Sequence, residues 1–306
     1  MSALPLTTAI VNYPYTRALT DGTIHSDRVK LQPLEVSPIT RAFRQMVRGL
    51  EYDLAEMAFS TYLCARTYQK PITALPLFIL RRFEHGQIVY NTRSGIQSPT
   101  DLHGRKVGVR SYTLTPGVWT RGILQSAYGV DPNQVTWVLL GDEHVQEYTA
   151  PSNVIAAPAG SDLSTLLLSG DIDAAIGLRD ADSPDIQPLI PDSHNAAIDY
   201  FRQTGVYPIS HIVVVKDEQL HANAWLAEEL FTLFQAAKAH YLSHPDANDT
   251  ALRDMQQIIG EDPLPYGVEP NRPTIETFIR FNVEQQIIPH SVEVEDIFPK
   301  SVLKLV

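Results

Sequence analysis

The stretch from Asp101 to Leu124 holds the residues whose types and order most clearly suggest chemistry. A polar turn containing Gly104 leads into a short apolar run, Lys106–Val109, which predicts a buried strand. A hydroxyl-rich segment, Ser111–Thr115, follows, and Pro116 suits the first turn of a helix, where a missing N–H costs nothing. This order directs backbone N–H groups at an anionic small molecule. An ordinary turn with its polar groups in water fits equally, so both interpretations stay open here.

Proton transfer is the second chemistry that the sequence suggests, because histidine titrates near neutral pH. Of ten histidines, His211 and His85 stand out, because each opens a predicted strand at a presumed boundary between two lobes. Either one fits equally well as a residue that satisfies a backbone group at a strand end. Glu56 ends another predicted strand between Ala55 and Met57, so its carboxylate is expected to be partly buried and to need a partner. It could accept a proton, hold a histidine tautomer or pair with an arginine.

The overall composition excludes several classes of protein. The chain has 306 residues, enough for two lobes, and a net charge of −11, which argues against nucleic acid and anionic membranes as partners. A single cysteine, Cys64, excludes an internal disulfide and a thiolate metal cluster. The N-terminus lacks the basic and apolar regions of a leader, and no apolar run approaches the ~20 residues of a membrane span. These features predict a cytoplasmic chain.

Strands and helices are predicted to alternate, which favours an α/β fold with mostly parallel sheets. The segment Leu75–Leu80 is apolar but interrupted by Pro76, and Ser161 is expected to cap a Leu-rich helix that Gly170 ends. Predicted strands cover 6–11, 31–36, 52–57, 87–91, 106–109, 134–139, 171–177 and 208–215, and predicted helices cover 38–49, 116–128, 162–169, 226–241 and 274–286.

Several stretches, in order along nearly the whole chain, carry a family resemblance. They are Thr16–Gly22, Tyr52–Met57 with Ser60 and Tyr62, Arg82–His85, Asp101–Val109, Tyr112–Gly122, Gly170–Ile176, Thr204–His211, and Asp262–Gly267 with Asn271 and Arg272. Together they resemble the 4,5-dihydroxyphthalate decarboxylase family, which is built on the type 2 periplasmic-binding-protein fold.

The resemblance implies two α/β lobes with mixed, mostly parallel sheets, joined by two crossover segments and holding a ligand between them. Lobe one would comprise residues 1–92 and 211–306, and lobe two residues 93–210. The crossings would fall near 91–93 and 207–209. Independently of the resemblance, the pattern of the sequence changes near Asp101, and the earlier pattern returns near Tyr207.

The resemblance also implies an activity: removal of one carboxylate from a hydroxylated aromatic diacid such as 4,5-dihydroxyphthalate, giving protocatechuate, without a cofactor. The partner would be a small aromatic carboxylate. This chemistry needs an anion stabiliser at the phenol, an acid near the ring carbon, and cations on the remaining carboxylate. One residue departs from expectation, because Glu84 places a negative charge beside His85.

Residues at predicted strand ends and loops are assigned to these roles. The proposed catalytic residues are His211, His85 and Glu56, and the proposed substrate-binding residues are Arg17, Arg82, Arg93 and Arg179 for carboxylates, Tyr13, Tyr62, Tyr112 and Trp119 for ring stacking, and Thr16, Ser60 and Thr115 for hydroxyl contacts. Each arginine taken singly fits a surface residue, and each aromatic fits a core residue.

Rival hypotheses remain open at this stage. The sequence has no His-x-Glu-x-His spacing, and Asp171 and Asp173 fit turn chemistry, so no metal is expected. The main alternative is a non-catalytic solute-binding protein for an aromatic carboxylate. A third class, a pyrimidine-type biosynthetic enzyme on the same fold, is disfavoured by the lack of a Cys-rich motif. The oligomeric state is not decided, so a homo-oligomer stays open.

Overall fold

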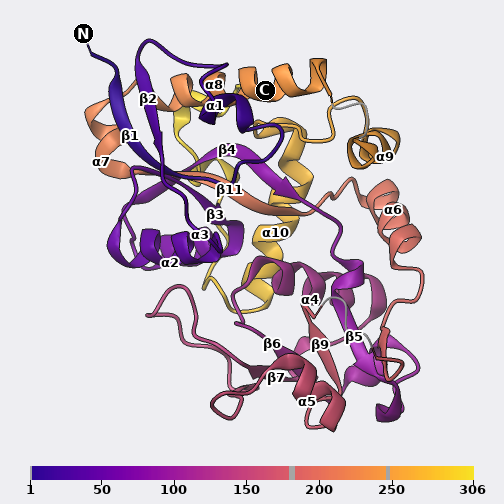
Figure 1. Ribbon diagram of the computed structural model, residues 1–306. Helices are drawn as coiled ribbons and strands as arrows, with labels where there is room; N and C mark the ends of the chain where they lie inside the picture. The colour runs from indigo at the N-terminus through magenta and orange to yellow at the C-terminus, as the bar shows by residue number, and fades with distance from the viewer. Residues whose placement is uncertain (1, 179–182, 246–248) are drawn as a thin grey trace. The chain divides into compact units, whose positions relative to one another are not determined.

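The chain folds into two compact units in a computed structural model that describes residues 2–178, 183–245 and 249–306 (Figure 1). Unit 1 comprises Met1–Arg81, Ile209–Ile275 and Val292–Val306, and unit 2 comprises Arg82–Pro208 and Glu276–Ser291. Each unit contains one mixed sheet with helices packed on it, so the predicted alternation of strands and helices is confirmed. Over the described residues, no helix is both long and apolar enough to cross a membrane.

Unit 1 is built on a five-stranded sheet in the order β2-β1-β3-β11-β4. Its strands are β1 (Leu4–Ala9), β2 (Val29–Pro33), β3 (Leu54–Ala58), β4 (Ile72–Arg81) and β11 (Ile209–Lys216), and its helices are α1 (Arg17–Thr20), α2 (Thr40–Gly49), α3 (Phe59–Thr67), α7 (Asp217–Ala222), α8 (Leu226–Ser243) and α9 (Thr250–Ile259). Strands β1, β2 and β3 are parallel, whereas β11 runs antiparallel to both of its neighbours, β3 and β4.

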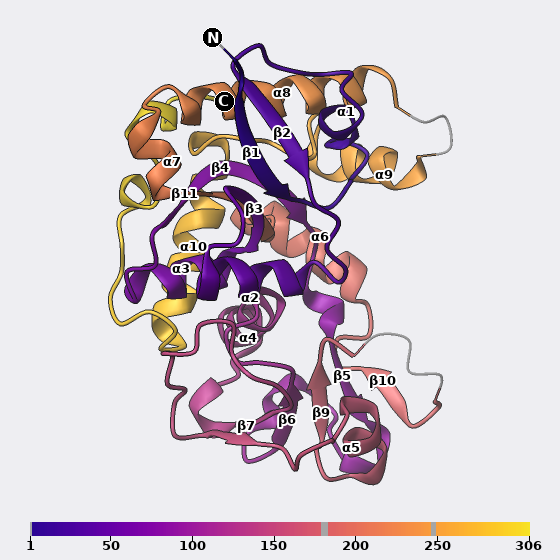
Figure 2. The same ribbon diagram turned by 60° about the vertical axis from the view of Figure 1, so that its left-hand side comes forward.

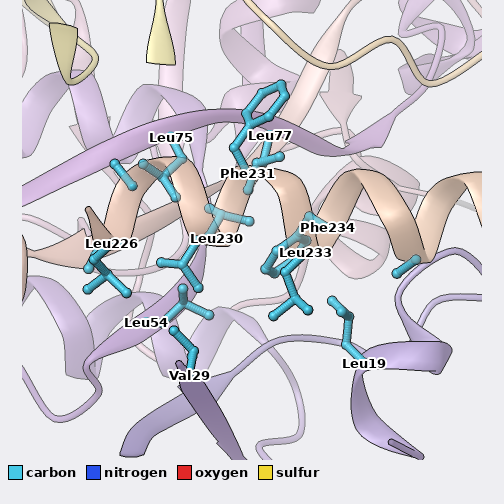
Figure 3. Packing of buried hydrophobic residues seen from close by; sticks show 14 of the residues in the cluster. Leu19, Val29, Leu54, Leu75, Leu77, Leu226, Leu230, Phe231, Leu233 and Phe234 are labelled. Carbon is cyan, nitrogen blue, oxygen red and sulfur yellow. The ribbon is translucent and has the colours of Figure 1, made fainter. Parts of the chain in front are cut away.

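Two helical layers cover the sheet of unit 1. Helix α8 lies along one face, and α2 and α3 lie along the other, as both views show (Figures 1 and 2). The apolar side of α8 packs through Leu226, Leu230 and Phe234 onto residues such as Leu54 and Leu75 of the sheet (Figure 3). These side chains are buried, and burying each large apolar side chain contributes roughly 1.5–3 kcal/mol to stability. The sheet of unit 1 therefore rests on a buried apolar core.

Strand β4 corrects one expectation, because it runs without a break through Pro76. An edge strand tolerates proline, and β4 is the last strand in the sheet order. The pairing of β4 with β11 shifts register between His211 and Val213, which face Leu80 and Leu75. Pro76 lies in the region of this shift, and its carbonyl accepts a hydrogen bond from the Gly267 N–H at 2.9 Å.

Unit 2 is built on a six-stranded sheet in the order β10-β5-β9-β6-β7-β8. Its strands are β5 (Ile88–Asn91), β6 (Lys106–Val109), β7 (Thr136–Leu139), β8 (Val154–Ala156), β9 (Ala174–Ile176) and β10 (Ile186–Pro188), and its helices are α4 (Thr115–Tyr128), α5 (Leu163–Ser169) and α6 (Ser193–Thr204). Strands β9, β6, β7 and β8 are parallel, and β5 and β10 are antiparallel to their neighbours. A core that includes Leu163, Leu167 and Ile172 packs α5 on this sheet.

Helix α4 packs tightly against the part of α10 (Arg272–Glu284) that belongs to unit 2. The Trp119 ring stacks on Phe278 at 4.5 Å between centroids and meets Phe281 edge-on at 5.7 Å. Gly122 makes this approach feasible, because a Cβ atom there would lie 2.1 Å from the Phe281 ring. The helix ends at Tyr128, and the following Gly129 caps it with a φ of +70°, in the left-handed region that glycine favours.

The structure differs from the sequence predictions at several points. Strand β5 pairs with β9 and β10, so the chain leaves unit 1 after Arg81 rather than near 91–93. Residues Glu276–Ser291 also belong to unit 2, because the α4 helix packs on them. Asp162, not Ser161, caps α5, since its carboxylate accepts the Thr165 N–H at 2.9 Å. Helices α6 and α9 were not predicted.

Candidate functional site

In unit 1, polar side chains gather at one edge of the sheet. Strands β1 and β3 are parallel, so their carboxyl ends lie at the same edge. Strand β11 is antiparallel to β3 and pairs His211 with Ala58, so the start of β11 reaches this edge as well. Ligands of open α/β sheets bind beyond the carboxyl ends of the strands. The edge is therefore the natural place for a site in this unit.

Glu56 and His211 form a hydrogen-bonded pair at this edge. Glu56 Oε1 lies 2.5 Å from His211 Nδ1, and Glu56 is completely buried, whereas the His211 side chain is 14% exposed. A carboxylate can only accept, so Nδ1 carries the hydrogen and Nε2 is the nitrogen left to exchange a proton. The Phe43 ring meets the imidazole edge-on, with 5.0 Å between centroids, and fixes its plane further. Of the three roles considered for Glu56, this contact matches the one in which the carboxylate holds a histidine tautomer.

The loop after β1 supplies two further hydrogen bonds to the Glu56 carboxylate. The Tyr13 hydroxyl donates to Oε1 at 2.7 Å, and the Val11 N–H donates to Oε2 at 2.9 Å. Buried Thr16 shapes this loop, because its hydroxyl donates to the Val11 carbonyl at 3.0 Å and accepts the Tyr13 N–H at 2.9 Å. The structure thus brings Tyr13, Thr16, Glu56 and His211 together, with Thr16 acting on the backbone.

In unit 2, Arg82, Glu84 and His85 follow the crossing from unit 1. Arg82 Nε donates to Glu84 Oε1 at 2.9 Å, with side chains 33% and 0% exposed. The charge of Glu84, unexpected beside a histidine, is thus directed at Arg82. His85 begins a 3₁₀ turn and is 2% exposed, and its ring meets Tyr200 of α6 edge-on at 5.3 Å. Within the described residues, neither ring nitrogen of His85 has a hydrogen-bond partner.

Burial lowers the pKa of His85 to about 4, because the charged imidazolium cannot be hydrated there. The unfolded chain binds this proton near pH 6.5, so the stability contributed by a neutral His85 is complete above that pH and is lost as pH falls toward 4. We expect the free energy of unfolding to drop by about 2 kcal/mol between pH 7 and pH 5 from this residue alone. Urea unfolding of His85→Phe, which keeps an aromatic contact with Tyr200, should show a correspondingly weaker pH dependence.

The matched control is His25→Gln, because His25 is exposed to water. It should keep the pH dependence of the wild type. If the free energy of unfolding of His85→Phe falls with pH as steeply as that of the wild type, the assignment of a buried neutral imidazole is contradicted.

The turn after β6 is also a polar cluster in unit 2. The Tyr112 ring is buried beneath the guanidinium of Arg121, whose Cζ lies 4.0 Å from the ring centroid. Thr115 is the first residue of α4 and is completely buried. The Glu143 carboxylate, from the segment after β7, accepts the Tyr112 N–H at 2.6 Å and the Thr113 N–H at 3.1 Å.

The proposed arginines that the structure describes belong to both units. Arg17 is exposed and lines a pocket of about 420 Å³ with His240, His244 and Asp249, among others, and neither Glu56 nor His211 is among its described lining residues. Arg93 lies in unit 2, where it donates to the Leu168 carbonyl and approaches Asp185 at 3.8 Å. Arg179 lies outside the described residues.

Three of the proposed contact residues are buried in the packing of their own units. The Tyr62 hydroxyl donates to the Ile297 carbonyl at 2.5 Å, and burial raises the pKa of this phenol. Ser60 is completely buried in α3, and Trp119 is completely buried against α10. Phe43, Arg121 and Glu143 were not assigned to the site from the sequence, although Arg121 lies in the stretch Tyr112–Gly122 that carries the resemblance.

Within the described residues, no group of three or more His, Cys, Asp or Glu side chains is arranged to hold a metal ion.

The fold and these sites define a class of protein. The profile of the family described as NMT1/THI5 like matches residues 44–248, so the chain is an NMT1/THI5-like protein. The periplasmic aliphatic sulphonate binding protein SsuA of Escherichia coli has a similar structure, with a TM-score of 0.57 and 12% identity over 98% of this chain and 92% of SsuA. The predicted type 2 periplasmic-binding-protein-like α/β fold class is confirmed.

Two curated relatives narrow the class. A 4,5-dihydroxyphthalate decarboxylase of Comamonas testosteroni is 30% identical over 302 residues, covering 91% of each chain. A 4,5-dihydroxyphthalate decarboxylase of Pseudomonas putida is 34% identical over 215 residues, covering 66% of this chain and 83% of the relative. The chain belongs to the 4,5-dihydroxyphthalate decarboxylase family, and the resemblance seen in the sequence is confirmed.

Proposed function

We propose that this chain is a carboxy-lyase that removes one carboxylate from a hydroxylated aromatic diacid such as 4,5-dihydroxyphthalate, with His211 as the proton donor. The observation that carries the proposal is the Glu56–His211 pair, which fixes one ring nitrogen and leaves the other for proton exchange. The activity named for both curated relatives supports the choice of substrate.

The electronic demand of the reaction determines which groups are needed. Each carboxylate of 4,5-dihydroxyphthalate is para to a ring hydroxyl. Ionising that hydroxyl moves electron density to the carbon that bears the carboxylate. Protonating this carbon gives a dienone, and breaking its bond to the carboxylate releases CO2 and restores the aromatic ring. The reaction consumes one proton and requires no oxidant or reductant.

His211 is suited to deliver this proton through Nε2. Glu56 holds the hydrogen on Nδ1 and stabilises the charged imidazolium before it donates. The proton passes to the ring carbon, and the neutral imidazole takes another from water after CO2 leaves. We do not assign this step to His85, because a pKa of about 4 keeps that ring neutral at pH 7.

Glu56 and Tyr13 serve as positioning residues in this proposal. Both oxygens of Glu56 already accept hydrogen bonds, from Val11, Tyr13 and His211. The carboxylate is therefore suited to orient the imidazole rather than to take the phenolic proton. The Tyr13 ring stacks on Tyr15 at 5.2 Å, and its hydroxyl is committed to Glu56, so Tyr13 stiffens the same carboxylate.

For the substrate carboxylate that remains, we propose Arg82 as a cation. Its hydrogen bond to Glu84 uses Nε and orients the guanidinium, which is one-third exposed. Arginine pairs with carboxylates through two parallel N–H bonds, each worth roughly 1.5–3 kcal/mol. We expect Arg82→Met to raise the KM for the diacid about ten-fold or more, while kcat falls less. Steady-state kinetics check this, and the control is Arg202→Met, which changes an exposed arginine of α6.

The function itself is tested by incubating the chelator-treated protein with 4,5-dihydroxyphthalate. Protocatechuate and CO2 should form in equal amounts. In deuterated water the product should carry one deuterium, at the carbon that lost the carboxylate. Tight binding without turnover would instead assign the chain to non-catalytic binding of an aromatic carboxylate.

A further inference from the structure

The turn between β6 and α4 already holds a carboxylate, that of Glu143. Besides the two backbone N–H groups of Tyr112 and Thr113, at 2.6 and 3.1 Å, the Thr113 hydroxyl donates to the same carboxylate. These three donors form what we call the amide cradle. Three donors around one carboxylate are the arrangement with which proteins bind anions.

The amide cradle lies where a ligand of this sheet would be expected. Strands β6 and β7 are parallel, and the chain leaves both at their carboxyl ends, the first toward Tyr112 and the second toward Glu143. The cradle immediately precedes α4, a helix of 14 residues whose N-terminus carries partial positive charge. An anionic guest is one of the two interpretations that the sequence leaves open for this turn, and the structure has the Glu143 carboxylate there.

A buried cation beneath the turn is a second, independent sign of an anion site. Arg121 is 1% exposed, and its hydrogen bonds reach neutral groups, the Gln285 amide oxygen at 2.7 Å and the Tyr112 carbonyl at 2.6 Å. Among the described residues its Nη1 has no hydrogen-bond partner, and this nitrogen lies 3.1 Å from where a Cβ of Gly117 would be, in the first turn of α4. A guanidinium held under the turn in this way attracts a negative charge to the cradle.

We propose that the Glu143 carboxylate occupies the amide cradle in the absence of substrate. A carboxylate of the aromatic diacid then displaces it when the diacid binds. This inference rests on the proposed function for the identity of the ligand. A substrate carboxylate in this place would accept the same three hydrogen bonds of the amide cradle. Glu143 therefore lowers the apparent affinity for carboxylates by competing with them, and it excludes neutral aromatic compounds, which cannot replace its charge.

The segment that carries Glu143 has other anchors, so the exchange does not require it to unfold. The Gly141 N–H donates to the Arg110 carbonyl at 2.8 Å, and Val145 and Tyr148 are buried on the other side of Glu143. Glu143 itself is neither fully buried nor fully exposed. Variants at this position are accordingly expected to fold.

The experiment measures binding of phthalate, which has two carboxylates but no ring hydroxyl and is not turned over. Isothermal titration of the full chain should give a dissociation constant about ten-fold lower for Glu143→Ala than for the wild type. Glu143→Gln should fall between them, because an amide oxygen is a weaker acceptor. The control, Glu147→Gln, changes an exposed glutamate of the same segment and should bind as the wild type does.

An unchanged or weaker affinity in Glu143→Ala, with the circular dichroism of the wild type, would show that Glu143 is a fixed structural tie and would overturn the inference. Absence of phthalate binding in every variant would do the same. Tighter binding in Glu143→Ala together with no decarboxylation by the wild type would support the inference and reject the proposed function. Decarboxylation by the wild type, together with an unchanged phthalate affinity in Glu143→Ala, would support the proposed function and overturn the inference.

Discussion

Replacing His211 with glutamine is expected to lower kcat for 4,5-dihydroxyphthalate by about 10³-fold and to leave the dissociation constant of phthalate within about two-fold. Proton transfer by a positioned side chain contributes roughly 10²–10⁴-fold to a rate. Glutamine can still donate an N–H to Glu56, but it cannot deliver a proton to the ring. The loss should therefore appear in the chemical step, and single-turnover kinetics with a separate phthalate titration will distinguish it from a loss of binding.

The neighbouring change, Glu56→Gln, should reduce kcat less, by about 10²-fold, because the imidazole stays but its tautomer and charge lose their support. His221→Gln, in the short helix α7, is the control and should be fully active. If His211→Gln decarboxylates at the rate of the wild type, His211 has no part in the chemistry.

Replacing Gly122 with alanine should destabilise the protein by about 3 kcal/mol, the upper range for overpacking a core. The new Cβ would lie 2.1–2.4 Å from three ring carbons of Phe281, and Phe281 is completely buried. The ring cannot move freely, because it is packed edge-on against Trp119. Urea unfolding measures the loss.

Gly49→Ala is the matched control, since it is also a helical glycine but a Cβ there meets only Glu51, at an ordinary 3.5 Å. It should be neutral or slightly stabilising. If the clash is the cause, Gly122→Ala combined with Phe281→Ala should cost less than the sum of the two single changes. Additive losses would point to another origin.

Local patterns sufficed for most of the strands and the long helices. The apolar run Lys106–Val109 is β6 residue for residue, and the helix begun near Pro116 is α4. Pro76 misled the prediction because its tolerance depends on the position of β4 in the sheet, which is a property of the whole fold. The place of β5 in the second sheet depends in the same way on long-range pairing with β9 and β10.

The candidate site was predictable where polar residues stand out in apolar strands. Glu56 and His211 are such residues, and their contact spans 155 positions in the sequence. Glu143 was not predictable, because it lies in a segment without periodicity and its partners are backbone N–H groups about 30 residues earlier. Trp119 was assigned to a ligand wall, since the sequence does not reveal that α10 packs against it.

The position of β11 has a consequence for how the protein is made. This strand lies between β3 and β4, yet the ribosome produces it only after all of Arg82–Pro208. At roughly 5–20 residues per second, the nascent β3 and β4 wait on the order of ten seconds with unpaired edges, a period in which chaperones can protect them. When Ile209–Lys216 emerges, it closes these edges and brings His211 to Glu56. A prematurely terminated chain should therefore be both aggregation-prone and inactive, so that incomplete synthesis yields no partial enzyme.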